Sequence, residues 1–408
     1  MQRVKIAVVG GGAAGLMAAG TAAEKGAAVT LFESNAKVGR KLYITGKGRC
    51  NLCNDCDIQT VLQNVLANPR FLYAALTAFP PQDVKAFFET QGVPLKTERG
   101  NRVFPVSDKA ADIIDALARW LKKTGVAVVH DTVSSLQKEN DAYIIQTNKK
   151  KYLVDRVIVA TGGVSYPQTG STGDGYRFAK EAGHTIVPPN PSLVPLVVPN
   201  GCAELMGLSL RNVRVTVFEN NKKIWSEFGE MLFTHFGLSG PLILSASAHM
   251  RHFGSRGYHI EIDLKPALDE QALDKRLLSD FKKYANSDYV NALNDLLPRK
   301  IIPLVVRYSE IAPHAKVNGI TKEQRRFLLH TLKHFLVVVS GKRPIAEAIV
   351  TSGGVAVKEI SPQTMESKKQ QGLYFAGEVL DVDAYTGGFN LQIAWSTGRL
   401  AGLSAAQA

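Results

Sequence analysis

Disulfides, long apolar runs and a surplus of acidic residues are all missing from this sequence. Its 408 residues contain only four cysteines, too few to staple a chain of this length. No stretch approaches about 20 consecutive apolar residues, and the uncharged run at residues 6–23 is broken by five glycines, unlike a signal peptide or membrane span. We therefore expect a soluble protein of the reducing cytoplasm with no membrane partner.

Acidic residues are also few, since 36 Asp and Glu stand against 49 Lys and Arg, a net charge of +13. Such an imbalance favours a polyanionic partner such as nucleic acid. Residues 299–343 hold only Glu310 and Glu323 as acids, but they hold ten basic residues: Arg299, Lys300, Arg307, Lys316, Lys322, Arg325, Arg326, Lys333, Lys342 and Arg343. A solvated helical face would explain this pattern too, but the surplus has no evident partner, so we expect contacts with phosphates.

The first informative motif is a strand–loop–helix–strand pattern near the N-terminus. Residues 4–9 predict a buried strand, residues 10–15 fit G-x-G-x-x-G, residues 13–25 predict a helix of small residues, and residues 28–32 predict a second strand. In this pattern Gly10 permits the tight turn, Gly12 lets a pyrophosphate approach, and Gly15 lets the helix close on the sheet. Glu33, about 20 residues further on, would accept from ribose hydroxyls. The segment predicts dinucleotide binding.

Two later segments indicate which dinucleotide binds. Residues 151–163 predict a strand that ends in Ala-Thr-Gly-Gly, and residues 373–378 predict another that ends in Gly-Glu. A helix is expected from about residue 393. Together with the first glycine motif, these two segments resemble the flavoproteins with two dinucleotide-binding domains, where the first fingerprint holds the ADP half of FAD. Glu378 departs from the commoner Asp of those proteins. We therefore expect FAD.

Three further motifs narrow the resemblance. Residues 37–54, 233–243 and 385–394 resemble the BaiN/YhiN-like bacterial family of FAD-dependent flavoproteins, and the likeness runs from end to end. The resemblance implies an α/β fold, with a discontinuous Rossmann-like FAD-binding domain, an inserted β-barrel domain and a small helical domain. It also implies reduction of a conjugated C=C bond, either in a bile-acid enone or in a uridine of ribosomal RNA that becomes dihydrouridine.

The order of patterns along the chain agrees with this architecture. Prolines at residues 188–199 indicate a linker, residues 208–218 and 257–264 alternate as strands do, and residues 269–335 show helical spacing. Residues 349–357 return to a strand. We assign residues 1–191 and 357–408 to the FAD-binding domain, 192–267 and 336–356 to the barrel-like insert, and 268–335 to the helical domain.

The expected cofactor contacts come from the fingerprint, the family motifs and the strand ends. A basic cluster at residues 37–49, with no acid between residues 34 and 54, is expected to face the anionic cofactor. The full set of predicted FAD-binding residues is Gly10, Gly12, Ala13, Ala14, Gly15, Glu33, Arg40, Lys41, Thr45, Gly46, Gly48, Cys50, Asn51, Val133, Ala160, Thr161, Gly162, Gly377, Glu378, Gly388, Phe389, Asn390, Leu391 and Gln392.

Cys50 and His235 are the predicted catalytic residues. Reducing a C=C bond by hydride transfer leaves an enolate that an acid must protonate, and a thiol with a pKa near 8.5 suits that task. A packed structural thiol and a hydrogen-bonded histidine at a domain junction are the respective alternatives. Cys50, Cys53 and Cys56 have metal-like spacing but lack a nearby fourth ligand, so we expect no metal. A redox disulfide would need a second nucleotide fingerprint, which is absent; Cys53 and Cys56 are expected to be incidental.

Two classes of function remain open. As an enzyme, the protein would receive hydride from NAD(P)H bound only transiently and pass it to a ribosomal RNA uridine, or to a small enone such as a steroid. As a non-enzyme, it would be an RNA- or protein-binding module that carries FAD as a structural plug or redox sensor. The basic stretch at residues 299–343 favours RNA over a neutral enone. The oligomeric state stays open.

Overall fold

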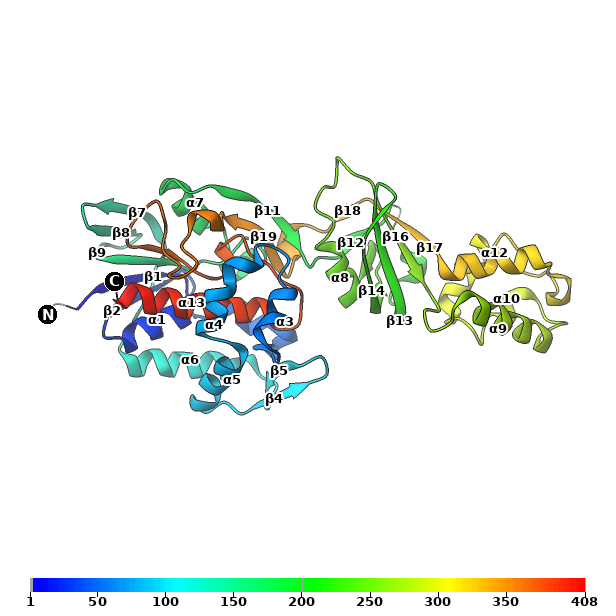
Figure 1. The fold of residues 1–408 in the computed structure, drawn as a ribbon, viewed down its shortest axis with the longest axis horizontal. Coiled ribbons are helices and arrows are strands. Elements are labelled where there is room, and N and C mark those ends of the chain that lie inside the picture. The colour runs from blue at the N-terminus through cyan, green and yellow to red at the C-terminus, as the bar shows by residue number, and fades with distance from the viewer. Residues whose placement is uncertain (1–2, 200, 408) are drawn as a thin grey trace. The chain divides into compact units, whose positions relative to one another are not determined.

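A computed structural model describes residues 3–199 and 201–407. The chain divides into unit 1, which comprises Met1–Ser192 and Ile345–Ala408, and unit 2, Leu193–Pro344 (Figure 1). Residues 345–356, which the sequence assigned to the insert, therefore belong to unit 1. The reason is pairing: β19 (Val350–Val355) forms an antiparallel pair with β11 (Ile186–Ser192). No helix among the described residues is long and apolar enough to cross a bilayer.

The centre of unit 1 is a parallel five-stranded sheet in the order β20-β10-β1-β2-β6. Its strands are β1 (Lys5–Val9), β2 (Ala28–Glu33), β6 (Ala127–His130), β10 (Arg156–Val159) and β20 (Leu373–Phe375). The inner strands consist mainly of buried Val, Ile, Leu and Phe, as expected when helices cover both faces of a parallel sheet. Unit 1 is thus a mixed α/β fold of the Rossmann type.

The predicted strand at residues 151–163 is two strands in different sheets. Lys151–Val154 (β9) joins an antiparallel sheet, whereas β10 joins the parallel one. Asp155 separates them, because its N–H donates to Lys5 O at 2.9 Å and its carboxylate accepts from the Lys5 N–H at 2.7 Å. The smaller strands of unit 1 are β3 (Cys53–Asn54), β4 (Leu95–Glu98), β5 (Arg102–Pro105), β7 (Val133–Glu139) and β8 (Ala142–Thr147).

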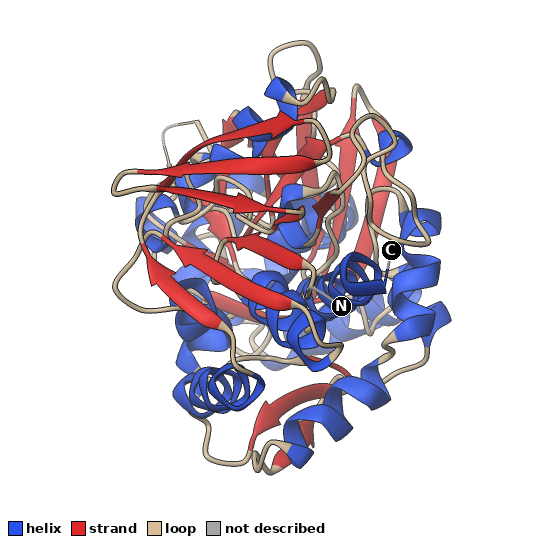
Figure 2. Cartoon of the chain, turned by 90° about the vertical axis from the view of Figure 1, so that its left-hand side faces the viewer, coloured by secondary structure: helices blue, strands red, loops and turns tan. Residues whose placement is uncertain are grey.

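Helices cover the parallel sheet, as the ribbon and the colouring by type show (Figures 1 and 2). They are α1 (Ala13–Glu24), α2 (Arg40–Ile44), α3 (Ile58–Gln63), α4 (Tyr73–Ala78), α5 (Pro81–Thr90), α6 (Ala110–Thr124), α7 (Asp174–Glu181) and α13 (Phe389–Gln407). The last begins four residues before the predicted start. It packs along α1 because Gly398 and Gly402 let its backbone touch Ala14 and Ala18; a Cβ at Gly398 would lie 2.3 Å from Ala14 O.

Unit 2 combines a seven-stranded sheet and a group of helices around one core. The sheet order is β17-β16-β13-β14-β15-β12-β18. The two ends of this order, β17 and β18, are separated only by Ser340, so the sheet curves back towards its own start. The predicted barrel stays a prediction that this order favours. The strands are β12 (Leu196–Val197), β13 (Ser209–Glu219), β14 (Lys222–Phe233), β15 (Gly237–Ser239), β16 (Tyr258–Asp263), β17 (Phe335–Val339) and β18 (Gly341–Lys342).

The helical pattern at residues 269–335 corresponds to several helices that share the core of the sheet. Besides α8 (Pro241–Ser247), they are α9 (Glu270–Lys283), α10 (Tyr289–Ala292), α11 (Ile302–Tyr308) and α12 (Lys322–Lys333). Buried side chains from α9 and α12, such as Leu277 and Leu328, join the same hydrophobic cluster as Val215 and Ile260 of the strands. Sheet and helices therefore share one core within unit 2, and the described residues of the predicted helical domain belong to that unit.

A buried polar network closes unit 1 beside β20. The His184 ring has no exposed side-chain surface, and its Nε2 lies 2.7 Å from Ser367 Oγ. Its Nδ1 lies 3.3 Å from Glu359 Oε2. Burial lowers the pKa of His184. Although burial opposes it, hydrogen bonds from Thr185 and Lys369 lower the pKa of Glu359 to about 2. Both groups therefore resist protonation in the folded chain.

Because both folded-state pKa values lie below their ordinary values, this network stabilises the fold at neutral pH, and its contribution falls as the pH falls. We expect His184→Gln to lower the free energy of unfolding at pH 7 by about 1–3 kcal/mol. The difference between wild type and variant should shrink as the pH is lowered from about 7 to 5, through the ordinary histidine pKa near 6.5. Denaturant unfolding at several pH values measures this, and a pH-independent difference would contradict it.

Candidate active site

The predicted cofactor residues gather at the carboxyl edge of the parallel sheet. Carboxyl ends of parallel strands meet at one edge, which is where open α/β sheets bind their ligands. All five strands deliver predicted residues to that edge: residues 10–15 follow β1, Glu33 ends β2, Val133 follows β6, residues 160–162 follow β10, and residues 377–378 follow β20. Five segments that are separated along the sequence thus converge at one edge.

Each glycine of the first loop meets a different steric demand. Gly10 has φ +107°, and a Cβ there would lie 2.5 Å from Ala160 O. A Cβ on Gly15 would lie 1.8 Å from Gly10 O, so Gly15 is needed for the helix to approach the loop. A Cβ on Gly12, by contrast, would meet no protein atom within 4 Å. Gly12 caps the N-terminus of α1, whose free N–H groups suit a phosphate. The space in front of Gly12 fits a pyrophosphate.

Glu33 faces this loop and is held there. Its Oε2 accepts from the Gly11 N–H at 2.9 Å, and its Oε1 accepts from the N–H and the side-chain amide of Asn35 at 2.8 and 2.6 Å. Glu33 is a buried residue, with 9% of its surface exposed. These bonds fix its direction, while each oxygen keeps acceptor capacity for a hydroxyl.

Glu378 serves protein groups from three other segments. Its Oε2 pairs with Lys41 Nζ at 2.6 Å, and its Oε1 accepts from Ser165 Oγ at 3.0 Å and from the Thr351 N–H at 2.8 Å. Lys41 also donates to Ser165 Oγ at 2.7 Å. Two predicted cofactor residues therefore neutralise one another, a contact that sequence spacing did not indicate. Their pair joins α2, the loop after β10, β19 and the turn after β20.

The basic cluster at residues 37–49 is less available to an anion than its composition suggests. Arg49 is ion-paired with Glu98 and Asp108 and lies over the Phe104 ring at 4.0 Å. Arg40 donates to the Asn35 side chain at 2.6 Å. The expectation that this cluster faces the cofactor is corrected for Arg49, because Glu98 and Asp108 pair with its guanidinium.

The segment at residues 45–54 lies against the start of α13. A Cβ on Gly388 would lie 2.3 Å from the Cys53 backbone, and Trp395 Nε1 donates to Leu52 O at 3.0 Å. The side chains of Asn390 and Gln392 bond to backbone carbonyls, of Ala384 and Phe79 respectively. The side-chain N–H groups of these two predicted residues thus stabilise the fold, and their contact with a cofactor stays a prediction. The same holds for the predicted contacts of Ala13, Ala14, Thr45, Gly46, Gly48, Val133, Ala160, Gly162, Gly377, Phe389 and Leu391.

The backbone around Cys50 is strained. Lys47 and Cys50 both lie in the left-handed region, with φ +60° and +59°, as do Gly46 and Gly48 on either side of Lys47. Non-glycine residues in this region carry strain that is concentrated at functional sites. The Cys50 side chain is fully buried, and this burial raises the pKa of its thiol to about 12. The thiol is therefore protonated at neutral pH, as a proton donor must be, but it is a weaker acid than the sequence-based argument assumed.

Cys53 resembles Cys50 in burial, and burial raises the pKa of its thiol to about 12 as well. Its Sγ lies 4.0 Å from Pro81 O. Burial raises the pKa of the half-buried Cys56 thiol to about 11. Among the described residues, no group of three His, Cys, Asp or Glu side chains is arranged as metal ligands would be.

His235 belongs to unit 2, in the turn between β14 and β15. Its ring is exposed and meets the Phe236 ring edge-on at 5.0 Å. Its carbonyl accepts from the Cys202 N–H at 3.0 Å. The catalytic assignment of His235 stays a sequence-based prediction.

The basic stretch at residues 299–343 also has more partners than expected. Four of its ten cations pair with acids outside the stretch: Arg307 with Glu204, Lys316 with Asp288, Arg325 with Asp274, and Lys333 with Asp263. The expectation of an unpartnered surplus is corrected, because the fold of unit 2 brings acids from residues 204 to 288 next to these four cations. Unit 2 as a whole holds 21 Lys and Arg against 14 Asp and Glu, so its net charge is +7.

One residue that sequence reasoning passed over lies among the predicted cofactor residues. Tyr176 is 8% exposed, and its hydroxyl has no hydrogen-bond partner. Burial raises its pKa, and the nearby charges of Glu378 and Asp381 raise it further. The backbone of the preceding Gly175 is pressed against Thr161, whose Oγ1 is likewise buried without a partner, as is Asn51 Oδ1. The glycines at residues 170, 173 and 175, which precede and begin α7, are the sequence signal for this close approach.

Comparison with known proteins decides the family. The sequence matches the family described as the HI0933-like protein Rossmann domain over residues 4–404. The chain belongs to this family. It is 31% identical over 409 residues to the 3-dehydro-bile acid delta(4,6)-reductase of Clostridium scindens, with 99% of each chain covered. It is 33% identical over 404 residues to the ribosomal RNA dihydrouridine synthase of Haemophilus influenzae, with 97% of each covered.

These matches confirm the family resemblance drawn from the three motifs. A solved structure, the 3-ketosteroid delta1-dehydrogenase of Sterolibacterium denitrificans, aligns with 98% of this chain and 99% of its own at a TM-score of 0.52. At 13% identity this similarity concerns the fold alone. The two curated relatives, each similar to this chain over nearly its full length, have different named reactions.

We expect Gly12→Val to keep the fold and lose bound FAD. Its side chain would enter space that contains no protein atom, at an ordinary φ of −84°, but it would occupy the position of the pyrophosphate. Flavin absorbance of the purified variant measures the loss. Gly15→Val is the contrasting variant, because its clash with Gly10 O should prevent folding. Full FAD occupancy in folded Gly12→Val would refute the assignment of this loop.

We expect Tyr176→Phe to weaken FAD binding without destabilising the apoprotein. Removing a buried hydroxyl that lacks a partner relieves its desolvation cost, typically about 1–3 kcal/mol. Thr21→Val is the matched control, since Thr21 Oγ1 is also buried without a partner but lies in α1 against α13. Both variants should unfold at or above the wild-type temperature, and only Tyr176→Phe should raise the Kd for FAD. Destabilised Tyr176→Phe apoprotein would instead indicate a structural bond.

Proposed function

We propose that this protein is a FAD-dependent oxidoreductase that receives hydride from NAD(P)H and reduces an activated C=C bond, with a uridine of ribosomal RNA as substrate. The observation that carries the first part is the convergence of predicted cofactor residues from all five strand ends at one edge of the sheet. In this proposal, the N-terminus of α1 holds the pyrophosphate and Glu33 holds the ribose.

The local chemistry of the site fits FAD. The space in front of Gly12 suits a pyrophosphate, and the unpartnered oxygens of Asn51, Thr161 and Tyr176 suit a ligand rich in hydroxyl, carbonyl and ring nitrogen groups. When bound, FAD supplies hydride transfer between a nicotinamide and the substrate. The remaining tasks, which are orientation, exclusion of water and protonation, belong to side chains of this chain.

Cys50 is the proposed proton donor. It is buried, protonated at neutral pH, and carried on a strained loop against the start of α13. Hydride addition to C6 of uracil leaves negative charge on the C4 carbonyl and on C5, and C5 must then receive a proton. A thiol of high pKa can donate only to a strong base, and the enolate of this reaction is one. A solvent proton must then restore the thiol after each turnover.

The choice of ribosomal RNA rests on the relative from Haemophilus influenzae and on the net charge of +7 in unit 2. The relative from Clostridium scindens supports a second candidate, a conjugated enone of a bile acid or other steroid. Both substrates need hydride delivery to a carbon conjugated with a carbonyl group, followed by protonation of its neighbour. They differ in charge: RNA is a polyanion that a basic protein surface attracts, whereas a neutral steroid gains nothing from such a surface.

We expect Cys50→Ala to bind FAD and to be reduced by NAD(P)H at the wild-type rate, but to reduce its acceptor about 10²- to 10⁴-fold more slowly. Cys53→Ala is the matched control, because its thiol is buried to a similar degree and has a similarly raised pKa. Stopped-flow spectroscopy separates the two half-reactions. Equal acceptor turnover in the two variants would return Cys50 to a structural role.

We expect deletion of the gene to remove a dihydrouridine from ribosomal RNA, and the purified protein with NAD(P)H to restore it. Protein-free RNA should be the better substrate, since a base must be unstacked and exposed to reach the site. Mass spectrometry of nuclease-digested RNA provides the measurement. Unchanged dihydrouridine in the deletion strain, together with reduction of a steroid enone by the protein, would establish the second candidate.

A further inference from the structure

The exposed face of α12 and the residue that caps its C-terminus, His334, carry a line of basic and imidazole side chains. Lys322, Arg326, His330 and His334 recur every four residues, and all four are exposed. We call them the α12 stripe. At 1.5 Å per residue it spans about 18 Å. Among the described residues, no ion pair holds Lys322 or Arg326, whereas Arg325 and Lys333 on the same helix are paired with Asp274 and Asp263.

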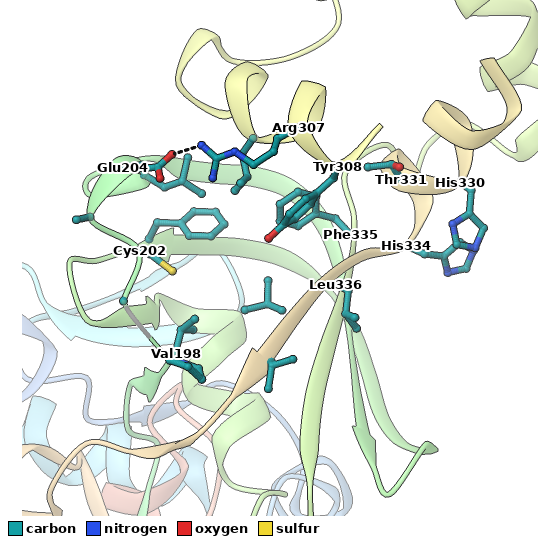
Figure 3. Close-up of a pocket in the computed structure, with 18 residues that line it drawn as sticks. Val198, Cys202, Glu204, Arg307, Tyr308, His330, Thr331, His334, Phe335 and Leu336 are labelled. Carbon is teal, nitrogen blue, oxygen red and sulfur yellow. Dashed lines mark hydrogen bonds and ion pairs between the residues drawn. The ribbon is translucent and has the colours of Figure 1, made fainter. Parts of the chain in front are cut away.

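The stripe ends at a groove of about 780 Å³ in unit 2. Leu205, Phe233, Leu304 and Phe335 are among the apolar residues that line it, and His330 and His334 line it as well (Figure 3). Figure 3 shows Tyr308 of α11 projecting into this groove, with Arg307 and Glu204 on the rim beside it.

The ring of Tyr308 offers an exposed face on which a planar group can stack. Its ring lies 5.3 Å from the Phe335 ring at a tilt of 39°, which holds it from one side, while 46% of the residue is exposed. Leu336 and Val338 of β17 are 50% and 55% exposed along the same groove. A surface that combines exposed rings with cations is typical of sites that stack nucleic acid bases and track the phosphate backbone.

We propose that the groove and the α12 stripe form a docking surface for single-stranded RNA, with a base stacked on Tyr308 and the backbone along Lys322 and Arg326. This inference rests on the proposed RNA substrate and names the surface that would hold it. Arg307 contributes to the same surface: its pair with Glu204 is 3.3 Å long and both side chains are at least 60% exposed, so a phosphate can compete for it. A neutral steroid would use the groove but not the stripe.

The test is binding of a fluorescein-labelled single-stranded oligouridylate to the FAD-loaded full chain, measured by anisotropy over a series of salt concentrations. Lys322→Gln/Arg326→Gln should bind more weakly, and the slope of log affinity against log salt should fall by about 1.4, the value for two lost phosphate contacts on a single strand. The matched control is Lys222→Gln/Lys223→Gln on β14, which removes the same charge from exposed positions of the same unit and should change little.

The second arm tests stacking. Tyr308→Ala should lower the affinity roughly 5- to 150-fold with an unchanged salt slope. Phe228→Ala, which removes a 51% exposed ring from β14 away from the groove, is its control. FAD content and the unfolding transition of each variant verify that it is folded.

The outcomes separate the two proposals. Equal losses in both double variants would mean that net charge alone attracts RNA, and would overturn the docking surface while leaving the RNA substrate intact. No binding of oligouridylate by the wild type would remove the RNA substrate itself. If the wild type then binds a conjugated steroid enone and Tyr308→Ala does not, the groove is a small-molecule site.

Discussion

The shared direction of five strands is the constraint on which unit 1 depends. Because β20, β10, β1, β2 and β6 all run parallel, each loop that follows a strand emerges at the same edge. The loops can then approach one another only if their backbones lack side chains at the crossing points. Gly10 and Gly15 meet this demand against Ala160 and against each other. Further along the same edge, the Lys41–Glu378 ion pair and its hydrogen bonds to Ser165 and Thr351 hold four segments together.

Much of unit 1 was predictable because its signals are local. A run of apolar residues followed by glycines, such as residues 4–12, indicates both a buried strand and a turn whose backbone is closely approached by other groups. Ion pairs between distant segments were not predictable: nothing near Arg49 in the sequence indicates Glu98 or Asp108, and the departure of Glu378 from Asp gave no hint of Lys41. The same holds for the basic stretch of unit 2, whose partners lie up to about a hundred residues away. Charge counted along a sequence therefore overstates the charge left on a surface.

In the proposed function, the site in unit 1 and the surface of unit 2 have separate tasks. Unit 1 would supply what any activated alkene requires, namely a place for a dinucleotide and a buried thiol that is protonated at neutral pH. Unit 2 supplies features on which substrates differ: an apolar groove, an exposed tyrosine and unpaired cations. Relatives with nearly full-length similarity and different named reactions are consistent with a retained unit 1 chemistry and a substrate choice made elsewhere.

The insertion of unit 2 between Ser192 and Ile345 has a consequence for synthesis of the chain. The strands β1, β2, β6 and β10 leave the ribosome early, but β20 and α13, which complete the sheet edge and cover α1, are translated last. Unit 2 is contiguous and can fold while the ribosome is still at work. The sheet edge of unit 1 stays open, and α1 stays uncovered, until residue 373 and the residues after it leave the ribosome. The sheet edge that carries the predicted cofactor residues is therefore complete only after most of the chain has been synthesised, and the nascent first half exposes apolar surface until then.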